Sequence, residues 1–365
     1  MAENRHGLSR DLLIYPGETI ADLLDERGMS QKELAKRSGV SEPFLSDVIR
    51  GKKDISKSLA KGLEYALGTP GSFWLNLQAN YDAELLTLQE EETVIDEERR
   101  ILKSLRDVVK YLSGISVISS SEDEQIILQL RKYLRVSNLT VLRDLVPAGA
   151  FRMSESVSVN PDVLGAWLCL CDVNADPDSV SGVFDKTKTD HLIHEIKAVM
   201  CSSKSDTRKA LKSVFARYGI DFSVVHNFRG APVHGYIERK ANGTYQMAVT
   251  IRGAYADIFW FSVFHELGHI VNGDLNKQGH FIDSGTGETK ERENAADHFA
   301  SEALLNPDDY ETFVCKESYT LQSIKTFAES QNVPVFIVIG RLQKEEKIPW
   351  NRFAGQKPRY RWAEE

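Results

Sequence analysis

The sequence predicts a mainly α-helical protein with a small β-sheet. Apolar residues recur at helical spacing, with turn signals between them, through residues 1–82. An acidic run then leads into further helical patterns, and strand-like segments begin only after Gly219. We therefore expect an all-helical N-terminal domain (1–82), an acidic helical connector (83–120), a helical middle region (121–218) and a C-terminal α+β domain (219–365).

The bulk composition limits the environment and partners of the chain. Its 365 residues suit two or three domains. The net charge of −8 argues against a general polyanion binder, so any nucleic-acid surface must be local. No apolar run approaches the roughly 20 residues of a membrane helix, the N-terminus lacks the apolar core of a secretion signal, and the four cysteines are scattered. These features predict a cytoplasmic protein without membrane contact.

Two short helices in the N-terminal domain form a recognisable pair. Gln31–Ser38 reads as a helix capped by Ser30, and Ser41–Arg50 reads as a second helix capped by Ser41. Gly39-Val40 makes the turn between them. This is the helix-turn-helix pattern, in which the second helix enters the major groove of DNA.

The residues expected to touch duplex DNA lie at the ends of these two helices. Contacts with phosphates are expected from Gln31, Lys32, Lys52 and Lys53. Contacts with bases are expected from Ser46 and Arg50, and Ser41 lies at the start of the reading helix. Residues 1–80 hold eleven basic and eleven acidic side chains, which leaves a dimerisation or partner-docking module as the alternative.

Specific binding by one such unit generally needs two half-sites, so we expect a homodimer. The apolar side chains at the end of the unit offer a dimer surface, or they pack against the connector; they are Trp74, Leu75, Leu77 and Tyr81.

In the connector, the spacing of apolar residues predicts one helix, with the preceding acidic run as its solvated first turns. These apolar residues are Ile101, Leu105, Val108 and Leu112.

The C-terminal domain contains the sequence His265-Glu266-Leu267-Gly268-His269. Four residues of α-helix turn about 400° and rise about 6 Å, so both imidazoles leave one face and can bind one metal ion. Glu266 is offset and can reach a water in an open coordination position. Asp257 is expected to cap this helix, and Asn272-Gly273 to end it. The helix is apolar all round and therefore buried, where polar groups need partners such as a metal.

A second helical segment supplies the remaining groups of a zinc site. Glu293 is predicted to be the third Zn²⁺ ligand, and Asp297, on the same helical face, to accept the second ring N–H of His265. Zinc with Glu266 as general base predicts hydrolysis of a peptide bond. The candidates to stabilise the oxyanion are His280, His298, Tyr255 and Tyr310, and sequence does not choose among them.

Two further segments allow more than one interpretation. Tyr245–Arg252 is interpreted as a plain sheet strand and, compatibly with that, as the sheet edge that aligns the substrate backbone. Basic and aromatic residues alternate from Arg341 to Arg361, and this tail either binds an acidic partner or nucleic acid or wraps its own domain.

Both ends of the chain resemble known families. The N-terminal domain resembles HigA-type antitoxins of the Cro/repressor-like (XRE) helix-turn-helix class, on Pro16-Gly17-Glu18, Leu34-Ala35, Gly39-Val40-Ser41, Gly51-Lys52 and Trp74–Gln78 with Tyr81-Asp82, although Tyr15 stands where His is usual. The C-terminal domain resembles ImmA/IrrE-type zincin-like metallopeptidases, on Asp257–Phe261, Phe264–His269, Glu293–Asp297, Phe299-Ala300 and Gly340–Gln343. Ala150–Arg152 and Ala166–Leu168 in the middle region are also similar to this two-domain family.

The resemblance implies zinc, a bacterial or phage origin and cleavage of a transcriptional repressor or antitoxin. Two functions therefore remain. One is a regulatory zinc endopeptidase with its own DNA-targeting module. The other is a non-enzymatic, antitoxin-like transcriptional regulator whose C-terminal domain docks or senses a partner. The absence of a recognisable fourth ligand from the sequence pattern favours the enzyme, because structural zinc sites are usually closed by four protein ligands.

Overall fold

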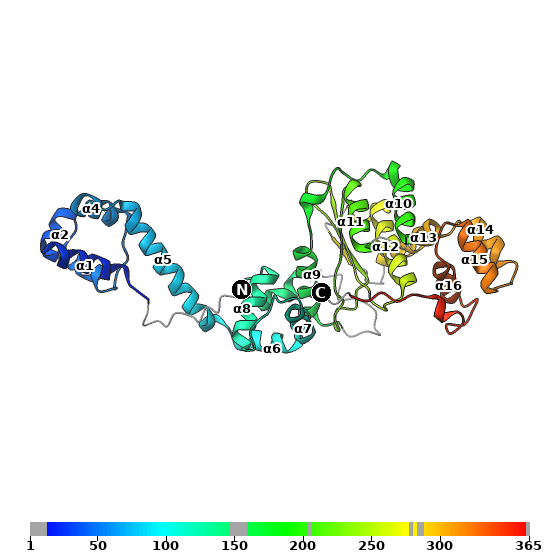
Figure 1. The fold of residues 1–365 in the computed structure, drawn as a ribbon, viewed down its shortest axis with the longest axis horizontal. Helices are drawn as coiled ribbons and strands as arrows, with labels where there is room; N and C mark the ends of the chain where they lie inside the picture. The colour runs from blue at the N-terminus through cyan, green and yellow to red at the C-terminus, as the bar shows by residue number, and fades with distance from the viewer. Residues whose placement is uncertain (1–12, 147–158, 203–205, 277–279, 283–287, 363–365) are drawn as a thin grey trace. The chain divides into compact units, whose positions relative to one another are not determined.

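The structure is a computed structural model that describes residues 13–146, 159–202, 206–276, 280–282 and 288–362 (Figure 1). It is mainly helical with one small sheet, which confirms the predicted fold class. The chain divides into two compact units, Met1–Asp96 and Glu97–Glu365. Within the described ranges, no helix combines the length and the apolar character needed to cross a membrane.

Unit 1 is helical throughout its described residues. Its elements are α1 (Pro16–Arg27), α2 (Gln31–Ser38), α3 (Glu42–Ile49), α4 (Lys57–Leu67), α5 (Gly71–Gln89) and the 3₁₀ turn η2 (Glu90–Thr93). Ser30 Oγ accepts a hydrogen bond from the backbone N–H of Glu33, and Ser41 Oγ accepts one from Phe44, so both predicted caps are confirmed. Gly39 takes a left-handed φ of 74° between α2 and α3, which completes the predicted helix-turn-helix.

The predicted dimer surface of unit 1 is largely used within the unit. Trp74 is fully buried in the core with Ile20, Leu34 and Leu45. Tyr81 packs edge-on against Tyr15, with ring centroids 5.0 Å apart. The start of α5 packs against α1 and α4, so its largest side chain fills the core instead of facing a partner. The prediction that Trp74 is available to a second copy was therefore wrong.

The predicted single connector helix is divided in two. The acidic residues Glu90–Glu92 belong to η2, and the helical pattern splits into α6 (Asp96–Ser104) and α7 (Arg106–Gly114). Leu105 lies between them with φ −89° and ψ 12°, and it is fully buried. Both short helices still bury apolar side chains, Ile101 and Leu102 from α6 and Val108 and Leu112 from α7.

Helices continue through the middle of unit 2. They are α8 (Asp123–Leu134), η3 (Leu139–Leu145), α9 (Pro161–Val173), η5 (Pro177–Ser179), η6 (Lys186–Lys188), α10 (Thr189–Cys201) and α11 (Thr207–Arg217). Arg131 and Glu98 form an ion pair of low exposure that also holds the backbone N–H of Leu139.

The sheet contains four strands among the described residues: β1 (Ile220–Val224), β2 (Gly235–Arg239), β3 (Tyr245–Val249) and β4 (His280–Ile282). Their order is β1-β3-β2-β4, with β1 parallel to β3 and β2 antiparallel to both β3 and β4. All five residues of β3 are buried, and β3 is paired on both sides. The interpretation of this strand as a substrate-aligning edge was therefore wrong, because its backbone groups are already used by β1 and β2.

The remaining helices carry the candidate site. They are α12 (Ala256–Asn272), η7 (Asp274–Asn276), α13 (Glu288–Leu304), α14 (Pro307–Val314), α15 (Leu321–Ser330), α16 (Val335–Lys344) and η8 (Ala354–Gln356). α12 packs against β2 and β3 on one side and against α13 and α16 on others. It is the central element of the larger core, which explains its nearly continuous apolar sequence.

The C-terminal strap, which we define as residues 357–360, wraps the start of α12. The backbone N–H of Ala256 donates to the Pro358 carbonyl at 3.0 Å, and Trp260 Nε1 donates to the Tyr360 hydroxyl at 2.9 Å. Lys357 is buried, with Nζ 2.6 Å from Asp257 Oδ2. Asp257 neutralises this lysine and makes no cap, since Tyr255 is the N-cap residue and no side chain caps α12 there. The predicted Asp257 cap was therefore wrong.

Candidate metal centre and nucleic-acid interface

The two histidines of α12 converge on one point. His265 and His269 are 7% and 0% exposed, and their Nε2 atoms lie 3.1 Å apart. The helix that positions them ends at Gly273, which adopts a left-handed φ of 76°. The spacing of four residues is therefore sufficient to place both ring nitrogens on one face of a buried helix.

Glu293 enters this group from α13. Its Oε2 lies 3.1 Å from His265 Nε2, and its Oε1 lies 3.7 Å from His269 Nε2. The two helices approach closely at Gly268, where an added Cβ would lie 3.1 Å from the Cα of Ala296. One ligand atom from each of the three residues lies within 4.8 Å of the others, so this group could hold a metal ion.

Each imidazole is also held from behind by a carboxylate. Asp297 Oδ1 lies 2.9 Å from His265 Nδ1, and Asp274 Oδ2 lies 2.7 Å from His269 Nδ1. Such contacts fix the tautomer that presents Nε2 to a metal. Asp297 lies where the sequence predicted it, whereas Asp274 was missed. Its only sequence signal is an acidic residue directly after the glycine that ends the helix.

The same carboxylates change the protonation of His265. Burial lowers the pKa of His265, but its hydrogen bonds to Asp297 and Glu293 outweigh burial and raise the pKa to about 10. Burial raises the pKa of Asp297, yet its contacts with His265 and Lys344 lower it overall. Without a metal, His265 is therefore protonated at neutral pH, and its positive charge offsets part of the negative charge of the neighbouring carboxylates.

The residues of this group have the donor types and the spacing that a metal ion such as zinc accepts. Ligands bonded at about 2.0–2.1 Å in a tetrahedron lie about 3.3 Å from one another. The two Nε2 atoms are 3.1 Å apart, close to that value, and each has a different oxygen of the Glu293 carboxylate nearby, Oε2 at 3.1 Å from His265 and Oε1 at 3.7 Å from His269. Glu293 Oε1 is buried and makes no hydrogen bond within the described part of the chain. Two imidazole nitrogens and one carboxylate form a donor set that zinc accepts, and in the described residues this group contains three ligands, not four.

Glu266 is packed beneath the sheet. Its side chain is 1% exposed, and it lies directly against Gly235 at the start of β2. A Cβ added to Gly235 would lie 2.1 Å from Glu266 Oε1 and 2.5 Å from its Cγ. Only glycine lets the strand approach this carboxylate so closely. No sequence signal identified Gly235.

The four oxyanion candidates are placed differently. The Tyr255 hydroxyl accepts a hydrogen bond from Arg359, and the Tyr310 hydroxyl donates one to Glu345. The His298 side chain is 72% exposed and contacts Glu302. The side chain of His280 lies outside the described residues. The described candidates therefore have partners outside the metal group, and the role stays unassigned.

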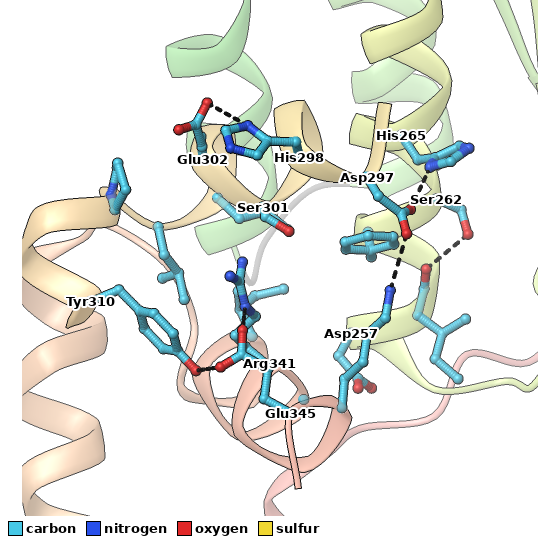
Figure 2. A pocket seen from close by; sticks show the side chains of 18 of the residues that line it. Asp257, Ser262, His265, Asp297, His298, Ser301, Glu302, Tyr310, Arg341 and Glu345 are labelled. Atoms are coloured by element: carbon cyan, nitrogen blue, oxygen red, sulfur yellow. Dashed lines mark hydrogen bonds and ion pairs between the residues drawn. The ribbon is translucent and has the colours of Figure 1, made fainter. Parts of the chain in front are cut away.

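A cavity of about 730 Å³ adjoins the metal group (Figure 2). Its walls come mainly from α12, α13, α14 and α16. His265 belongs to both the cavity wall and the metal group, and the wall also includes Asp297, which contacts His265 from behind. Most of the remaining wall is apolar. The site therefore has both a candidate metal centre and an adjacent space large enough for a ligand.

The predicted DNA contacts of unit 1 are mostly accessible. Those that are exposed in this unit are Gln31, Lys32, Ser41, Arg50, Lys52 and Lys53, while Ser46 is half-buried. The hydroxyl of Ser41 is already used as the helix cap, and Lys53 lies 3.1 Å from Asp47 on α3. This ion pair offsets one of the acidic charges on the reading helix that would repel phosphate.

Comparison with known proteins identifies unit 1. A helix-turn-helix family profile matches residues 20–74. Virulence-associated protein A' of Dichelobacter nodosus is 41% identical over 69 residues, which cover 19% of this chain and 60% of that protein. The HTH-type transcriptional regulator YddM of Escherichia coli K12 is 30% identical over 84 residues, which cover 23% of this chain and 84% of YddM. The chain thus spans less than two thirds of the first protein and most of the second.

Among solved structures, the chain is similar to the Pseudomonas aeruginosa antitoxin HigA, determined with the higBA promoter. That match has 29% identity, a TM-score of 0.21, and covers 23% of this chain and 97% of HigA. The matched helix-turn-helix profile and the likeness to YddM define the class: through unit 1, the chain belongs to the helix-turn-helix family of transcriptional regulators.

Proposed function

We propose that the protein is a zinc-dependent regulatory endopeptidase that is targeted to DNA by its helix-turn-helix unit. Its substrate would be a protein, specifically a transcriptional repressor or an antitoxin, as the resemblance to ImmA/IrrE-type peptidases implies. The observation that carries the proposal is the buried group of His265, His269 and Glu293, which offers three protein ligands. Three is the number that catalytic zinc sites use, since they keep the fourth position for water or substrate. The protein would act in the cytoplasm.

The chain's own residues have distinct roles in this proposal. His265, His269 and Glu293 hold the zinc, while Asp297 and Asp274 fix the two imidazoles from behind. When bound, zinc polarises the scissile carbonyl and acidifies water. Glu266 takes a proton from the attacking water and later gives one to the leaving amine. Its packing against Gly235 holds the carboxylate in one position.

A metal assay and two kinds of variant test the enzymatic proposal. The purified chain is expected to hold about one zinc ion, and His265→Ala, His269→Ala and Glu293→Ala are each expected to remove it. Glu266→Gln is expected to retain zinc and lose hydrolysis by about 10²–10⁴-fold. Full zinc in all three ligand variants would refute the ligand assignment. Zinc retention with no hydrolysis of any repressor or antitoxin by the parent chain would favour the non-enzymatic regulator.

For unit 1, we propose specific binding to duplex DNA as a homodimer. The support is the helix-turn-helix with Gln31 and Lys32 exposed at the start of α2, and Arg50 and Lys52 exposed after α3. Lys52→Ala is expected to weaken binding to all sequences alike, whereas Ser46→Ala or Arg50→Ala is expected to change which sequence is preferred.

The test is a titration of the full chain against DNA from its own promoter region and against a scrambled duplex, with sedimentation to measure the stoichiometry. Because basic and acidic residues balance in residues 1–80, we expect weak binding to the scrambled duplex and a shallow salt dependence. Equal affinity for both duplexes would instead indicate that unit 1 docks a protein.

A further inference from the structure

The cavity beside the metal group has a wall that combines apolar and charged side chains. Its apolar part is formed by side chains from three helices, namely Ile258, Phe261, Leu304 and Ile337. The charged residues of the wall are Asp257, Asp297, Glu302, Arg341, Lys344 and Glu345. Ser301 of α13 points into the space that these residues enclose (Figure 2).

The carboxylates of the wall all contact basic side chains. Asp257 pairs with Lys357 at 2.6 Å, and Asp297 with Lys344 at 3.6 Å. Glu302 lies 3.0 Å from His298 Nδ1, and Glu345 contacts Arg341. Each wall carboxylate thus already has a partner, and two of these partners, Arg341 and Lys344, line the cavity themselves. An occupant therefore gains chiefly from apolar burial.

The position of the cavity indicates which apolar occupant it takes. His265 is at once a member of the metal group and part of the cavity wall. A chain whose backbone reaches the metal therefore places its neighbouring side chains at the cavity. The volume of about 730 Å³ exceeds what one side chain needs and lies in the range that encloses a ligand of short-peptide size.

We propose that this cavity recognises a cluster of large apolar residues next to the bond that is cleaved. The substrate class is thus a polypeptide with adjacent Leu-, Ile- or Phe-type side chains, as occur in segments that are normally buried. This inference rests on the proposed peptidase function. It would direct the enzyme to a substrate whose apolar segment has become accessible.

The test measures binding separately from cleavage. The full chain carrying Glu266→Gln is loaded with zinc and titrated with two fluorescein-labelled peptides, identical except for a central Leu-Phe-Leu or Asp-Ser-Asp. We expect the apolar peptide to bind at least about tenfold more tightly. Adding Ser301→Trp, which fills the cavity, should remove that preference. Ser330→Trp at the exposed end of α15, which does not line the cavity, should keep it.

A second variant guards against misfolding. Ser301→Asp adds little bulk but places an unpaired charge in the cavity, and it should also abolish the preference, with folding checked by circular dichroism. Equal affinity for the two peptides, or an unchanged preference in a folded Ser301 variant, overturns the proposal. The apolar dye 8-anilinonaphthalene-1-sulfonate gives a further check. If Ser301→Trp loses dye binding but binds both peptides as before, the proposal is overturned and the cavity is assigned to a small molecule.

Cleavage of the same peptides by the parent chain separates the two proposals. Preferential binding without any cleavage refutes the peptidase and leaves recognition by the cavity standing. Cleavage of both peptides at equal rates supports the peptidase and refutes the recognition site.

Discussion

Gly235→Ala is the substitution whose effect on Glu266 follows most directly from the structure. The new Cβ would lie 2.1 Å from Glu266 Oε1, 2.3 Å from its Cδ and 2.5 Å from its Cγ. Ordinary contacts between such atoms begin near about 3.5 Å, so the carboxylate must move by roughly 1 Å. Glu266 is 1% exposed and β2 is paired on both sides, so neither partner has free space.

The expected consequence is a loss of activity with the metal retained. A displacement of about 1 Å in a reacting group can cost about 10²-fold in rate. Overpacking should lower the free energy of unfolding by about 1–3 kcal/mol. The three atoms nearest to the new methyl group all belong to Glu266 and none to His265, His269 or Glu293. Zinc content should therefore remain near one per chain.

The assay compares zinc content, urea unfolding and turnover of an identified substrate for the parent, Gly235→Ala and Gly355→Ala. Gly355 is a matched control because an added Cβ would meet no atom within 4 Å. Parental turnover by a folded Gly235→Ala protein would refute the reasoning that this glycine holds Glu266 in position. Loss of zinc would show that the strand supports the ligands as well.

Three further predictions follow from contacts around the site. Asp274→Ala and Asp297→Ala should each weaken zinc binding by about 10–100-fold without abolishing it, as measured by competition with a chelator; unchanged affinity in both would show that the carboxylates do not orient the imidazoles. The pKa of His265 is raised to about 10 without metal, so zinc must displace a proton from it at neutral pH. Zinc affinity should therefore fall about tenfold for each unit of decreasing pH. A pH-independent affinity between about pH 6 and 8 would contradict this. Lys357→Ala leaves the Asp257 carboxylate buried without its cation and should lower the free energy of unfolding in urea by about 3–5 kcal/mol. The double change Lys357→Met with Asp257→Leu should lower it less. Equal losses in the two variants would argue against an uncompensated charge as the cause.

The parts of the site that sequence predicts are those set by helical periodicity. The spacing of His265 and His269 fixes their common face, and the spacing of Glu293 and Asp297 does the same on the second helix. Gly235 could not be predicted, because its proximity to Glu266 comes from the packing of β2 on α12. Asp274 could have been proposed from its position after the helix end, but only the turn geometry aims it at His269.

Errors in the fold arose where tertiary contacts decide between two local possibilities. Tyr245–Val249 has the residues of an edge strand or a central one, and the arrival of β1 and β2 on its two sides makes it central. Trp74 could equally have faced a second copy, and the closure of α5 onto α1 and α4 buries it. By sequence, Asp257 is suited to cap the helix, but in the fold its carboxylate forms an ion pair with Lys357, which lies far along the chain.

The C-terminal strap also affects the order of events during synthesis. Residues 357–360 emerge from the ribosome after His265, His269 and Glu293, and translation proceeds at about 5–20 residues per second. For a period of seconds, the nascent domain therefore has His265, His269 and Glu293 while the start of α12 lacks Lys357 and Tyr360. A metal ion held by this group would therefore meet its binding residues before the helix that carries two of them is secured at its N-terminal end.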